Sequence, residues 1–466
     1  MASPAHRGAA TPTRRLQRGL RFAILALLVA APIAFGSVHE PAYVAVLAVV
    51  FVTGLLSWAR GHWARAHGAD VPRVPALRIL LALQALVLLQ LIPLPPALLA
   101  WLSPGSSKYW DFVTLGASGA RPISASPADT LRGLAFLAAM SLFFGTVFRE
   151  FRDERWRRRL ALAVAGTGFL ITLIALLQKA SASGKIFGLW EPRWDWSVFG
   201  PYVNRNHFAG YLVMAIPLAM GFAAEAVQEL RRNWSRRRIG WVALGDPQGQ
   251  AALQRFGFAM TLVVGLLASE SRGGFLGFAV SVASLLFVLR AGWQALIALG
   301  GAAAAAFAFV GVSRIVGGFE TRGIQASRLD LWGDCLRMWT DFPLFGAGFN
   351  AFGTAHPRYQ TKWPGVWFGE AHSEYVQVFV DLGLVGAGLV ALLLLVLFRS
   401  AFRIARRSPL ESGLFASLVG GAAHNLVEFN WQIPANALTY VALAALAVAA
   451  ERGQPSRGLD PPRPDA

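Results

Sequence analysis

Long runs of apolar residues without a single charge constrain this sequence more than any other feature. Such runs recur along the whole chain, at 23–35, 79–91, 160–177, 275–289 and 385–398. A soluble protein cannot bury so many continuous apolar runs in its core, whereas a helix of about 20 mostly apolar residues crosses the hydrocarbon core of a bilayer. The sequence therefore predicts an all-α polytopic integral membrane protein.

The composition agrees with this class. Hydrophobic residues make up 55% and charged residues 15% of the 466 residues, whereas soluble domains contain about 45–50% and 25%. These values exclude soluble enzymes, nucleic-acid-binding modules, disordered scaffolds and secreted disulfide scaffolds. Because Cys335 is the single cysteine, the chain can form neither an internal disulfide nor a cysteine-based metal site.

About twelve transmembrane helices are predicted, each close to the ~20 residues needed to cross a bilayer. The first is also compatible with a signal peptide, because basic residues precede it, but its long basic region and the span that follows at once favour a membrane helix. The predicted spans are 21–38, 42–59, 77–95, 131–148, 159–178, 208–226, 256–270, 273–290, 292–312, 376–398, 412–429 and 433–450.

The net charge of +18 comes mostly from arginine clusters between the apolar runs. With twelve spans, every cluster falls on one side of the membrane, which the positive-inside rule assigns to the cytoplasm. The pattern indicates loops that face anionic lipid rather than a nucleic-acid partner. We therefore expect a cytoplasmic tail at 1–20, a membrane domain at 21–450 and a disordered cytoplasmic tail at 451–466. The clusters lie at 14–21, 60–78, 149–159, 231–238, 290, 399–407 and 452–463.

The longest segment on the opposite, periplasmic face is a loop at 313–375, between the ninth and tenth predicted spans. A structureless loop of this length is uncommon, and such loops are usually functional. Its first half has apolar residues at helical spacing, which predicts an amphipathic helix on the membrane surface. This helical stripe consists of Leu329, Trp332, Leu336 and Trp339, and the residues that then break the helix are Pro343, Gly346, Gly348 and Gly353.

Polar residues gather at the periplasmic ends of the predicted spans, while the interiors of the spans are almost free of charge. An unpaired charge is costly at this depth, so each of these residues needs a partner, a polar cavity or a lipid headgroup. We take the following as candidate site residues: Arg205, Asn206, His207, Glu270, Arg272, Arg328, His372, Glu374, His424, Glu428 and Asn430.

Three of these residues carry the most specific chemistry. Arg272 lies in a short Ser-Arg-Gly-Gly turn, where a guanidinium could hold a phosphate with paired donors; an ion pair with Glu270 or snorkelling to the interface is the alternative. Arg328 could do the same or face lipid headgroups. His372 could act as a general base or orient a hydroxyl, or it could simply pack. The histidines show neither HxxxH nor HExxH spacing, so a metal site is weakly supported.

Several short motifs in this region resemble the O-antigen ligase family. His372 and Ser373, followed after nine residues by Gly-Leu-Val-Gly at 383–386, resemble the family signature His-(Asn/Ser/Gln)-x9-Gly-x-x-Gly. The resemblance extends over roughly 200–440. Its other motifs are Ser-Arg-Gly-Gly at 271–274, Gly-Ala-Gly-Phe-Asn at 346–350, Val-Asn-Arg-Asn-His-Phe-Ala-Gly at 203–210 and His-Asn-Leu-Val-Glu-Phe at 424–429.

The resemblance implies a multi-pass glycosyltransferase of the bacterial inner membrane, active at its outer face. Members of the family move a glycan from undecaprenyl diphosphate to a hydroxyl acceptor, which is the lipid A core in lipopolysaccharide biosynthesis. Similar proteins polymerise O-antigen or exopolysaccharide. By the same resemblance, His372, Arg272 and Arg328 are implied to be catalytic, although other loop arginines compete for the role of Arg328. These rivals are Arg314, Arg322, Arg337 and Arg358.

This chemistry needs neither a cofactor nor a metal. The diphosphate leaves as an anion that arginine can stabilise, and a histidine can serve the acceptor hydroxyl. An in-line displacement would invert the anomeric centre. The substrate-binding residues that we expect are Arg205, His207, Glu270, Glu374 and His424.

A ligase and a polymerase share this machinery, and the residues do not separate them. A transporter is the alternative of a different class, and it should show broken helices and ionisable residues near the membrane midplane. Away from the span ends, Asp381 and His424 are the candidates for such residues, and both lie toward the outer end of their spans. A purely structural scaffold would not need arginine and histidine concentrated on one face.

Overall fold

The computed structural model describes residues 5–181, 184–191, 198–233, 245–290, 326–362 and 367–453. Within these ranges the chain is helical and forms no strand beyond isolated β-bridges. Nine helices in the described ranges are long and apolar enough to cross a membrane, which makes this a multi-pass membrane protein. They are α1 (Ala5–Ile33), α2 (Glu40–Ala66), α6 (Pro127–Glu150), α7 (Glu154–Ser181), α8 (Arg205–Asn233), α9 (Pro247–Ala268), α10 (Arg272–Leu289), α15 (Glu374–Ile404) and α17 (Pro434–Arg452).

Two further apolar helices are shorter. α3 (Leu77–Leu91) has 15 residues and α16 (Pro409–His424) has 16, and they correspond to the third and eleventh predicted spans. The predicted span at 292–312 lies outside the described residues, so the count of twelve stays a prediction. α1 already begins at Ala5, so much of the expected tail at 1–20 is helical.

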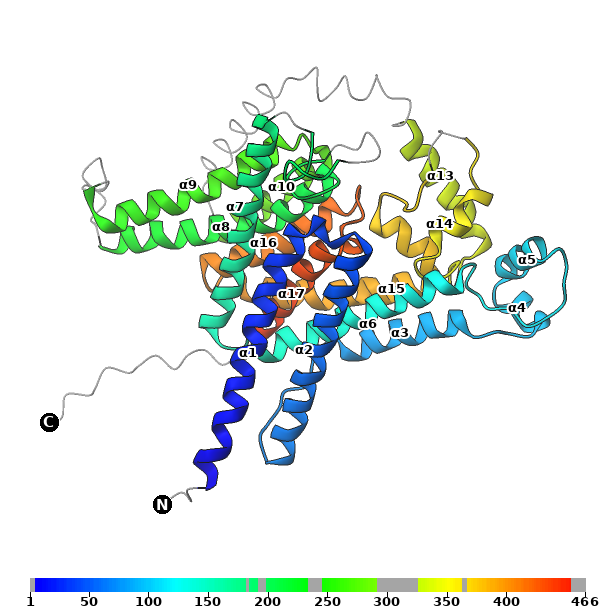
Figure 1. The fold of residues 1–466 in the computed structure, drawn as a ribbon, viewed down its shortest axis with the longest axis horizontal. Helices are drawn as coiled ribbons and strands as arrows, with labels where there is room; N and C mark the ends of the chain where they lie inside the picture. Colours follow the sequence, from blue (N-terminus) through cyan, green and yellow to red (C-terminus); the bar gives the residue numbers. More distant parts are fainter. Residues whose placement is uncertain are drawn as a thin grey trace.

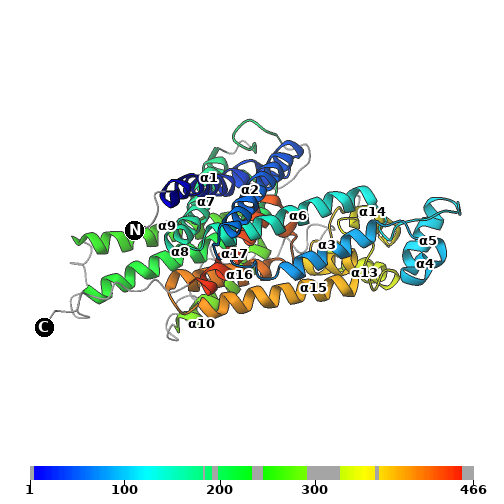
Figure 2. The ribbon, with the colours of Figure 1, turned by 90° about the horizontal axis from the view of Figure 1, so that it is seen from below.

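The helices pack around α17, which is buried along nearly its whole length (Figure 1). α8, α10 and α16 form one closely packed group, and α3, α6 and α15 run side by side in both views (Figure 2). Small residues allow this packing, since half of the buried positions of α17 are alanines. Close approach through small residues is typical of helices packed within a bilayer.

The chain before α15 forms a compact cap of short helices. α13 (Ala326–Asp341) and α14 (Phe352–Ala355) lie beside the N-terminal part of α15, near α4 (Pro96–Leu102) and α5 (Pro104–Val113) (Figure 1). The predicted helix in this loop is confirmed, and it ends before Pro343 as expected. α13 packs on the protein through Leu331, Cys335 and Met338, which are at most 2% exposed.

The helical stripe proposed for the membrane surface divides between two environments. Leu329 and Leu336 are 76% and 61% exposed. By contrast, Trp332 and Trp339 contact the protein, and the Trp332 indole donates a hydrogen bond to the Ala371 carbonyl at 2.9 Å. α13 therefore supports the segment that carries His372, and its contact with a membrane stays a prediction.

The Gly-Ala-Gly-Phe-Asn motif at 346–350 and the Gly-Leu-Val-Gly motif at 383–386 lie next to each other, at the point where the loop crosses α15. α15 is interrupted at Gly383, whose φ of 64° lies in the left-handed region that favours glycine. There the amides of Leu384 and Val385 donate to the carbonyls of Pro343 and Leu344 at 2.8 and 3.1 Å. The crossing ties the loop to α15 by backbone hydrogen bonds and fixes where α15 starts.

The arginine clusters gather at one end of the helix bundle. Arg21 Nε donates to the Glu150 carbonyl at 2.6 Å, which joins α1 to the end of α6. Arg152 reaches the carbonyl of Arg452 at 3.3 Å, and Arg158 pairs with Glu225 of α8 at 2.7 Å. These contacts agree with the predicted one-sided charge distribution, while the identity of that side stays a prediction.

This topology predicts which positions a membrane-impermeant thiol reagent reaches in a Cys335→Ser background. Cys335 is buried, whereas positions 362 and 155 are both exposed and lie on the capped end and the arginine-rich end, respectively. Cysteine at position 362 should be labelled in intact cells and cysteine at position 155 only after permeabilisation. The reverse pattern would overturn the orientation and the periplasmic location of the site.

Candidate functional site

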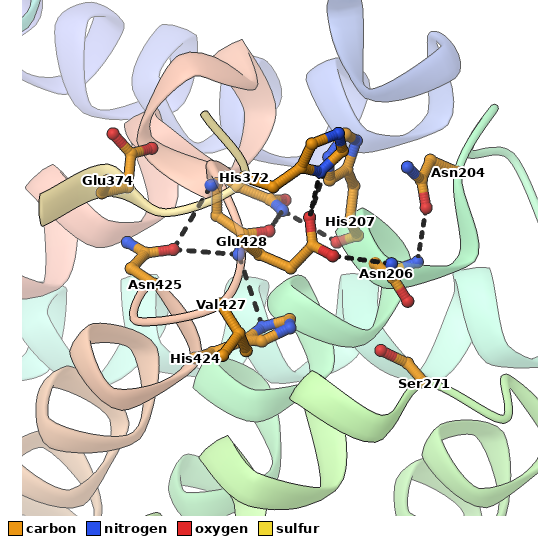
Figure 3. A network of polar contacts seen from close by, with 12 residues as sticks. Asn204, Asn206, His207, Ser271, His372, Glu374, His424, Asn425, Val427 and Glu428 are labelled. Atoms are coloured by element: carbon orange, nitrogen blue, oxygen red, sulfur yellow. Dashed lines mark hydrogen bonds and ion pairs between the residues drawn. The ribbon is translucent and has the colours of Figure 1, made fainter. Parts of the chain in front are cut away.

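Five segments that lie far apart in the sequence meet around Glu428. Figure 3 shows labelled residues from the start of α8, the turn before α10, the segment before α15 and the loop after α16. The five segments come from the start of α8, the turn between α9 and α10, the first turn of α13, the segment before α15 and the loop after α16. The sequence motifs therefore converge on one site. The segments are 204–210, 271–274, Arg328, 372–374 and 424–430.

Glu428 is the central residue of this site. Its side chain is 1% exposed, and Oε1 accepts hydrogen bonds from Arg328 Nη2 at 2.8 Å and Asn206 Nδ2 at 2.7 Å. Arg328 also donates through Nη1 to the carbonyl of Val427 at 3.1 Å. One carboxylate thus joins α13, α8 and the loop after α16.

Glu428 is held in its charged form. Burial by itself would raise the pKa of the Glu428 carboxyl, but the neighbouring His372 imidazole and the charges of Arg328 and His207 outweigh burial and lower this pKa to about 2. The carboxylate therefore keeps its negative charge at neutral pH.

The second oxygen of Glu428 faces two imidazoles. Oε2 lies 3.9 Å from His207 Nε2 and 3.9 Å from His372 Nδ1, both longer than a normal hydrogen bond. It receives no hydrogen bond from any of the described residues. The Phe429 ring meets both imidazoles edge-on, with centroids at 4.7 and 5.0 Å. Oε2 and the imidazole nitrogens thus retain hydrogen-bonding capacity next to each other.

His372 is fixed in an unusual backbone conformation. Its φ of 52° is left-handed, which is uncommon for a residue other than glycine and persists only where the surroundings impose it. The amide of Ala371 donates to Gln377 Oε1 at 2.7 Å, and the amide of Glu374 donates to the carbonyls of Asn425 and Glu428 at 3.0 and 3.2 Å. The His372 side chain remains 26% exposed, so the imidazole is both held in place and accessible.

Three arginines surround the same place. Arg272 is the first residue of α10, which Ser271 caps by accepting a hydrogen bond from the Gly274 amide. Arg205 is the first residue of α8, and the positive charges of Arg205 and Arg328 both act on Arg272. Glu270 pairs with Lys179 at 3.1 Å and with Arg205 at 3.7 Å. The N-termini of α8, α10 and α15 add the positive ends of three helix dipoles.

His424 lies beneath this surface. It is 0% exposed, and its Nδ1 lies 3.3 Å from Asn430 Nδ2. Gly273 packs directly on its ring, because a Cβ at Gly273 would come within 3.0 Å of His424 Cδ2 and Nε2. Position 273 requires a glycine because the start of α10 packs against the His424 ring. A binding role for His424 stays a prediction.

An asparagine network below Glu428 was missed at the sequence level. Asn430 donates to Asn425 Oδ1 at 2.9 Å, and Asn436 donates to Asn430 Oδ1 at 2.9 Å and to the His207 carbonyl at 2.8 Å. Glu428 and Asn206 were recognised as polar span-end residues, but their pairing was not foreseen. The available signal was an acidic residue, Glu428, that lies at the same membrane depth as several basic side chains.

A cavity of about 550 Å³ adjoins the site. Apolar side chains of α2, α6, α15 and α17 form its walls, and Phe429 and Glu374 belong to both the cavity and the site. Its polar end carries Glu370, Glu374 and Asp381. Burial, followed by the charges of Asp381 and Glu374, raises the pKa of the Glu370 carboxyl well above its ordinary value. Glu374 Oε1 accepts a hydrogen bond from the Trp431 amide at 2.6 Å.

Metal ligands do not cluster in the described part of the chain. No group of three or more His, Cys, Asp or Glu side chains there is placed to hold a metal ion.

Replacing Glu428 by glutamine should weaken both activity and stability. The change removes the charge that pairs with Arg328, and transfer of the site's substrate should fall by about tenfold or more, as for loss of one charge-assisted hydrogen bond. Glu451→Gln is the matched control, because Glu451 forms an exposed pair with Arg403 at the other end of the bundle.

The stability effect of this change should depend on pH. The pKa of Glu428 is lowered in the fold, so its charge stabilises the fold above the unfolded pKa, and this stabilisation is lost as pH falls through about 2. The difference in Tm between the wild type and Glu428→Gln should therefore be largest at neutral pH and shrink below about pH 4.5. A difference that does not change with pH would show that the charge of Glu428 is not stabilising.

Comparison with known proteins identifies the region that carries the site. Residues 257–391 match the O-antigen ligase family. The match includes Arg272, Arg328 and His372, whereas the segments 204–210 and 424–430 lie outside it and join the site through the fold. The matched region, 257–391, is shorter than the region of predicted resemblance, 200–440. A comparison with curated proteins gives no match. The chain therefore carries an O-antigen ligase family domain at 257–391.

Proposed function

We propose that this protein is a membrane glycosyltransferase that moves a glycan from undecaprenyl diphosphate to a hydroxyl acceptor at the periplasmic face of the inner membrane. The O-antigen ligase family match and the membrane-spanning helices support a membrane glycosyltransferase-like function. The observation that carries the finer proposal is the convergence of Arg205, Arg272 and Arg328 beside His372 at the ends of these helices.

The arginine side of the site suits the diphosphate of the donor. Arg205, Arg272, Arg328 and Lys179 carry four positive charges there, and Glu270 and Glu428 carry two negative ones. Glu428 holds Arg328 without neutralising the whole group, and the three helix N-termini add to the positive potential. These charges would stabilise the negative charge that develops on the leaving diphosphate, without a metal.

The acidic end of the adjoining cavity suits a different part of the substrates. The cavity lining offers one arginine, Arg132, whereas three arginines gather at the site, so we place the diphosphate at the site arginines rather than in the cavity. The apolar walls of the cavity are compatible with a hydrocarbon chain, and the rest of the polyprenyl tail can remain in the bilayer.

His372 would act on the acceptor. As the acceptor oxygen bonds to the anomeric carbon, the bond from that carbon to the diphosphate oxygen breaks, and the hydroxyl proton passes to the His372 imidazole. Attack opposite the leaving group inverts the anomeric centre. Glu428, 3.9 Å from His372 Nδ1, would stabilise the resulting imidazolium as a positioning residue. The same geometry serves a lipid A core acceptor in a ligase or a growing glycan in a polymerase.

Arg272→Lys should lose most transfer activity while the protein still inserts and accumulates. Lysine keeps the positive charge but not the paired donor geometry of the guanidinium, so transfer should fall by about 10- to 100-fold. Transfer would be measured with purified protein and a lipid-linked glycan donor.

The matched control for this experiment is Arg337→Lys. Arg337 is a rival loop arginine, and it forms an ion pair with Asp334 on α13. This control should keep near-normal transfer. If Arg272→Lys also transfers normally, Arg272 does not clamp the diphosphate through paired donors.

His372→Ala should reduce transfer by about 10²–10⁴-fold, the usual contribution of a general base, while donor binding persists. The reason is that the arginines hold the diphosphate and His372 serves the acceptor. The measurement is the transfer rate per folded protein, beside binding of a non-transferable donor analogue.

Glutamine variants of Glu370 and Glu374 identify the alternative bases. If one of these carboxylates is the base, its variant should be severely impaired and His372→Ala only mildly. If His372 merely packs, residual activity should follow the amount of folded protein. Normal transfer by His372→Ala would remove this residue from the mechanism.

A further inference from the structure

A second polar pocket lies at the opposite end of the bundle from the candidate site. It has a volume of about 370 Å³ and forms between the middle of α1, the C-terminal part of α2 and the end of α6. α6 connects the two ends, because the Asp129 carbonyl near its start accepts a hydrogen bond from Asn350 and Arg149 near its end lines the pocket. Twenty residues of helix separate these two positions by about 30 Å.

Four arginines line this pocket, and each comes from a different part of the fold. Arg21 belongs to α1, Arg60 to α2, Arg149 to the last turn of α6 and Arg152 to the turn before α7. Such a gathering of positive charge is costly unless an anion accompanies it.

The buried residue Glu150 holds two of the pocket arginines in place. Glu150 is 0% exposed, and its side chain accepts hydrogen bonds from Arg60 Nη2 at 2.8 and 2.9 Å and from Ser57 at 2.6 Å. Its backbone carbonyl accepts one from Arg21 Nε. The charge of Glu150 is thus committed to Arg60, and the positions of Arg21 and Arg60 are fixed.

With Glu150, Asp70 and Asp153 beside the four arginines, one net positive charge remains among the described residues of the pocket. Asp70 and Asp153 also line the pocket, but no ion pair within 4 Å joins either of them to one of the four arginines there. The Nε donors of Arg60, Arg149 and Arg152 are buried without a hydrogen-bond partner. Buried donors in native proteins are almost always paired, so three such donors around one pocket point to a ligand with acceptor oxygens.

We propose that this pocket binds an oxyanion of the phosphate class, carried either by the headgroup of an anionic lipid or by a soluble phosphate. Guanidinium groups match phosphate oxygens with paired, charge-assisted hydrogen bonds. Arg149 lies in the last turn of α6 and Arg60 in the last two turns of α2, and both helices are apolar enough to span a membrane, so these two residues lie near the depth of lipid headgroups. The site is independent of the proposed transfer reaction, which takes place at the other end of α6.

The test uses the full-length protein and two sources of phosphate. In one arm, the protein is placed in phosphatidylcholine nanodiscs that contain a small fraction of phosphatidylglycerol, and retained lipid is counted by native mass spectrometry. In the other arm, inorganic phosphate is titrated against chloride at constant ionic strength in neutral nanodiscs, and Tm is followed. Retention in the first arm identifies a lipid headgroup, and a rise of Tm in the second identifies a soluble anion.

Two double variants separate the pocket from general surface charge. Arg149→Gln with Arg152→Gln removes two pocket arginines and leaves the Arg60–Glu150 pair intact, whereas Arg14→Gln with Arg18→Gln removes two exposed charges from α1 outside the pocket. The pocket variant should bind the retained anion at least about tenfold more weakly, as for loss of one charge-assisted hydrogen bond, and the control should bind as the wild type does.

A third variant tests the pocket independently if the pocket double variant fails to fold. Ala64→Phe fills the pocket from α2 and changes no charge, and it should lose binding as well. The proposal is overturned if the wild type retains neither form of phosphate, if the pocket and control double variants lose binding equally, or if folded Ala64→Phe binds as tightly as the wild type.

Discussion

The ion pair between the buried Glu428 and the partly exposed Arg328 is the interaction on which the rest of the site depends. Glu428 is 1% exposed, and it joins a helix of the cap to the ends of two helices of the bundle through Arg328, Asn206 and the loop after α16. Removing one partner of a fully buried pair costs about 3–5 kcal/mol, and the cost is smaller here because the Arg328 side chain is 36% exposed and water screens its charge. The pair therefore couples the position of the cap to the arrangement of His207 and His372 around the same carboxylate.

Backbone geometry supplies the second constraint. α15 starts at Glu374 because Ser373 caps it and the crossing at Gly383 fixes its register against the loop. The left-handed conformation of His372 is held by hydrogen bonds on both sides of the residue, from the Ala371 amide and from the Glu374 amide. A side chain that must meet two substrates gains from such fixation, since little conformational freedom is lost when the substrates bind.

Much of this arrangement could be predicted from the sequence, because the apolar runs indicate how deep in the membrane each residue lies. Apolar runs locate the span ends, and arginine counting assigns those ends to faces, so the convergence of Arg272, Arg328 and His372 was expected. Which side chains pair with one another at the same membrane depth could not be predicted in this way. That Glu428 pairs with Arg328 rather than another arginine, and that Trp332 supports Ala371, depends on tertiary packing that no local pattern encodes. The protein-facing side of α13 could not be predicted for the same reason, since Leu331 and Met338 meet partners from distant segments.

The central claim is that the arginines, not the acidic cavity, hold the diphosphate of the donor beside His372. A structure of the protein bound to undecaprenyl diphosphate tests this claim most directly. We predict phosphate density between the guanidinium groups of Arg205, Arg272 and Arg328, with the His372 imidazole facing the open side of the terminal phosphate. Phosphate density at the polar end of the cavity, against Glu370 and Asp381, would contradict the account.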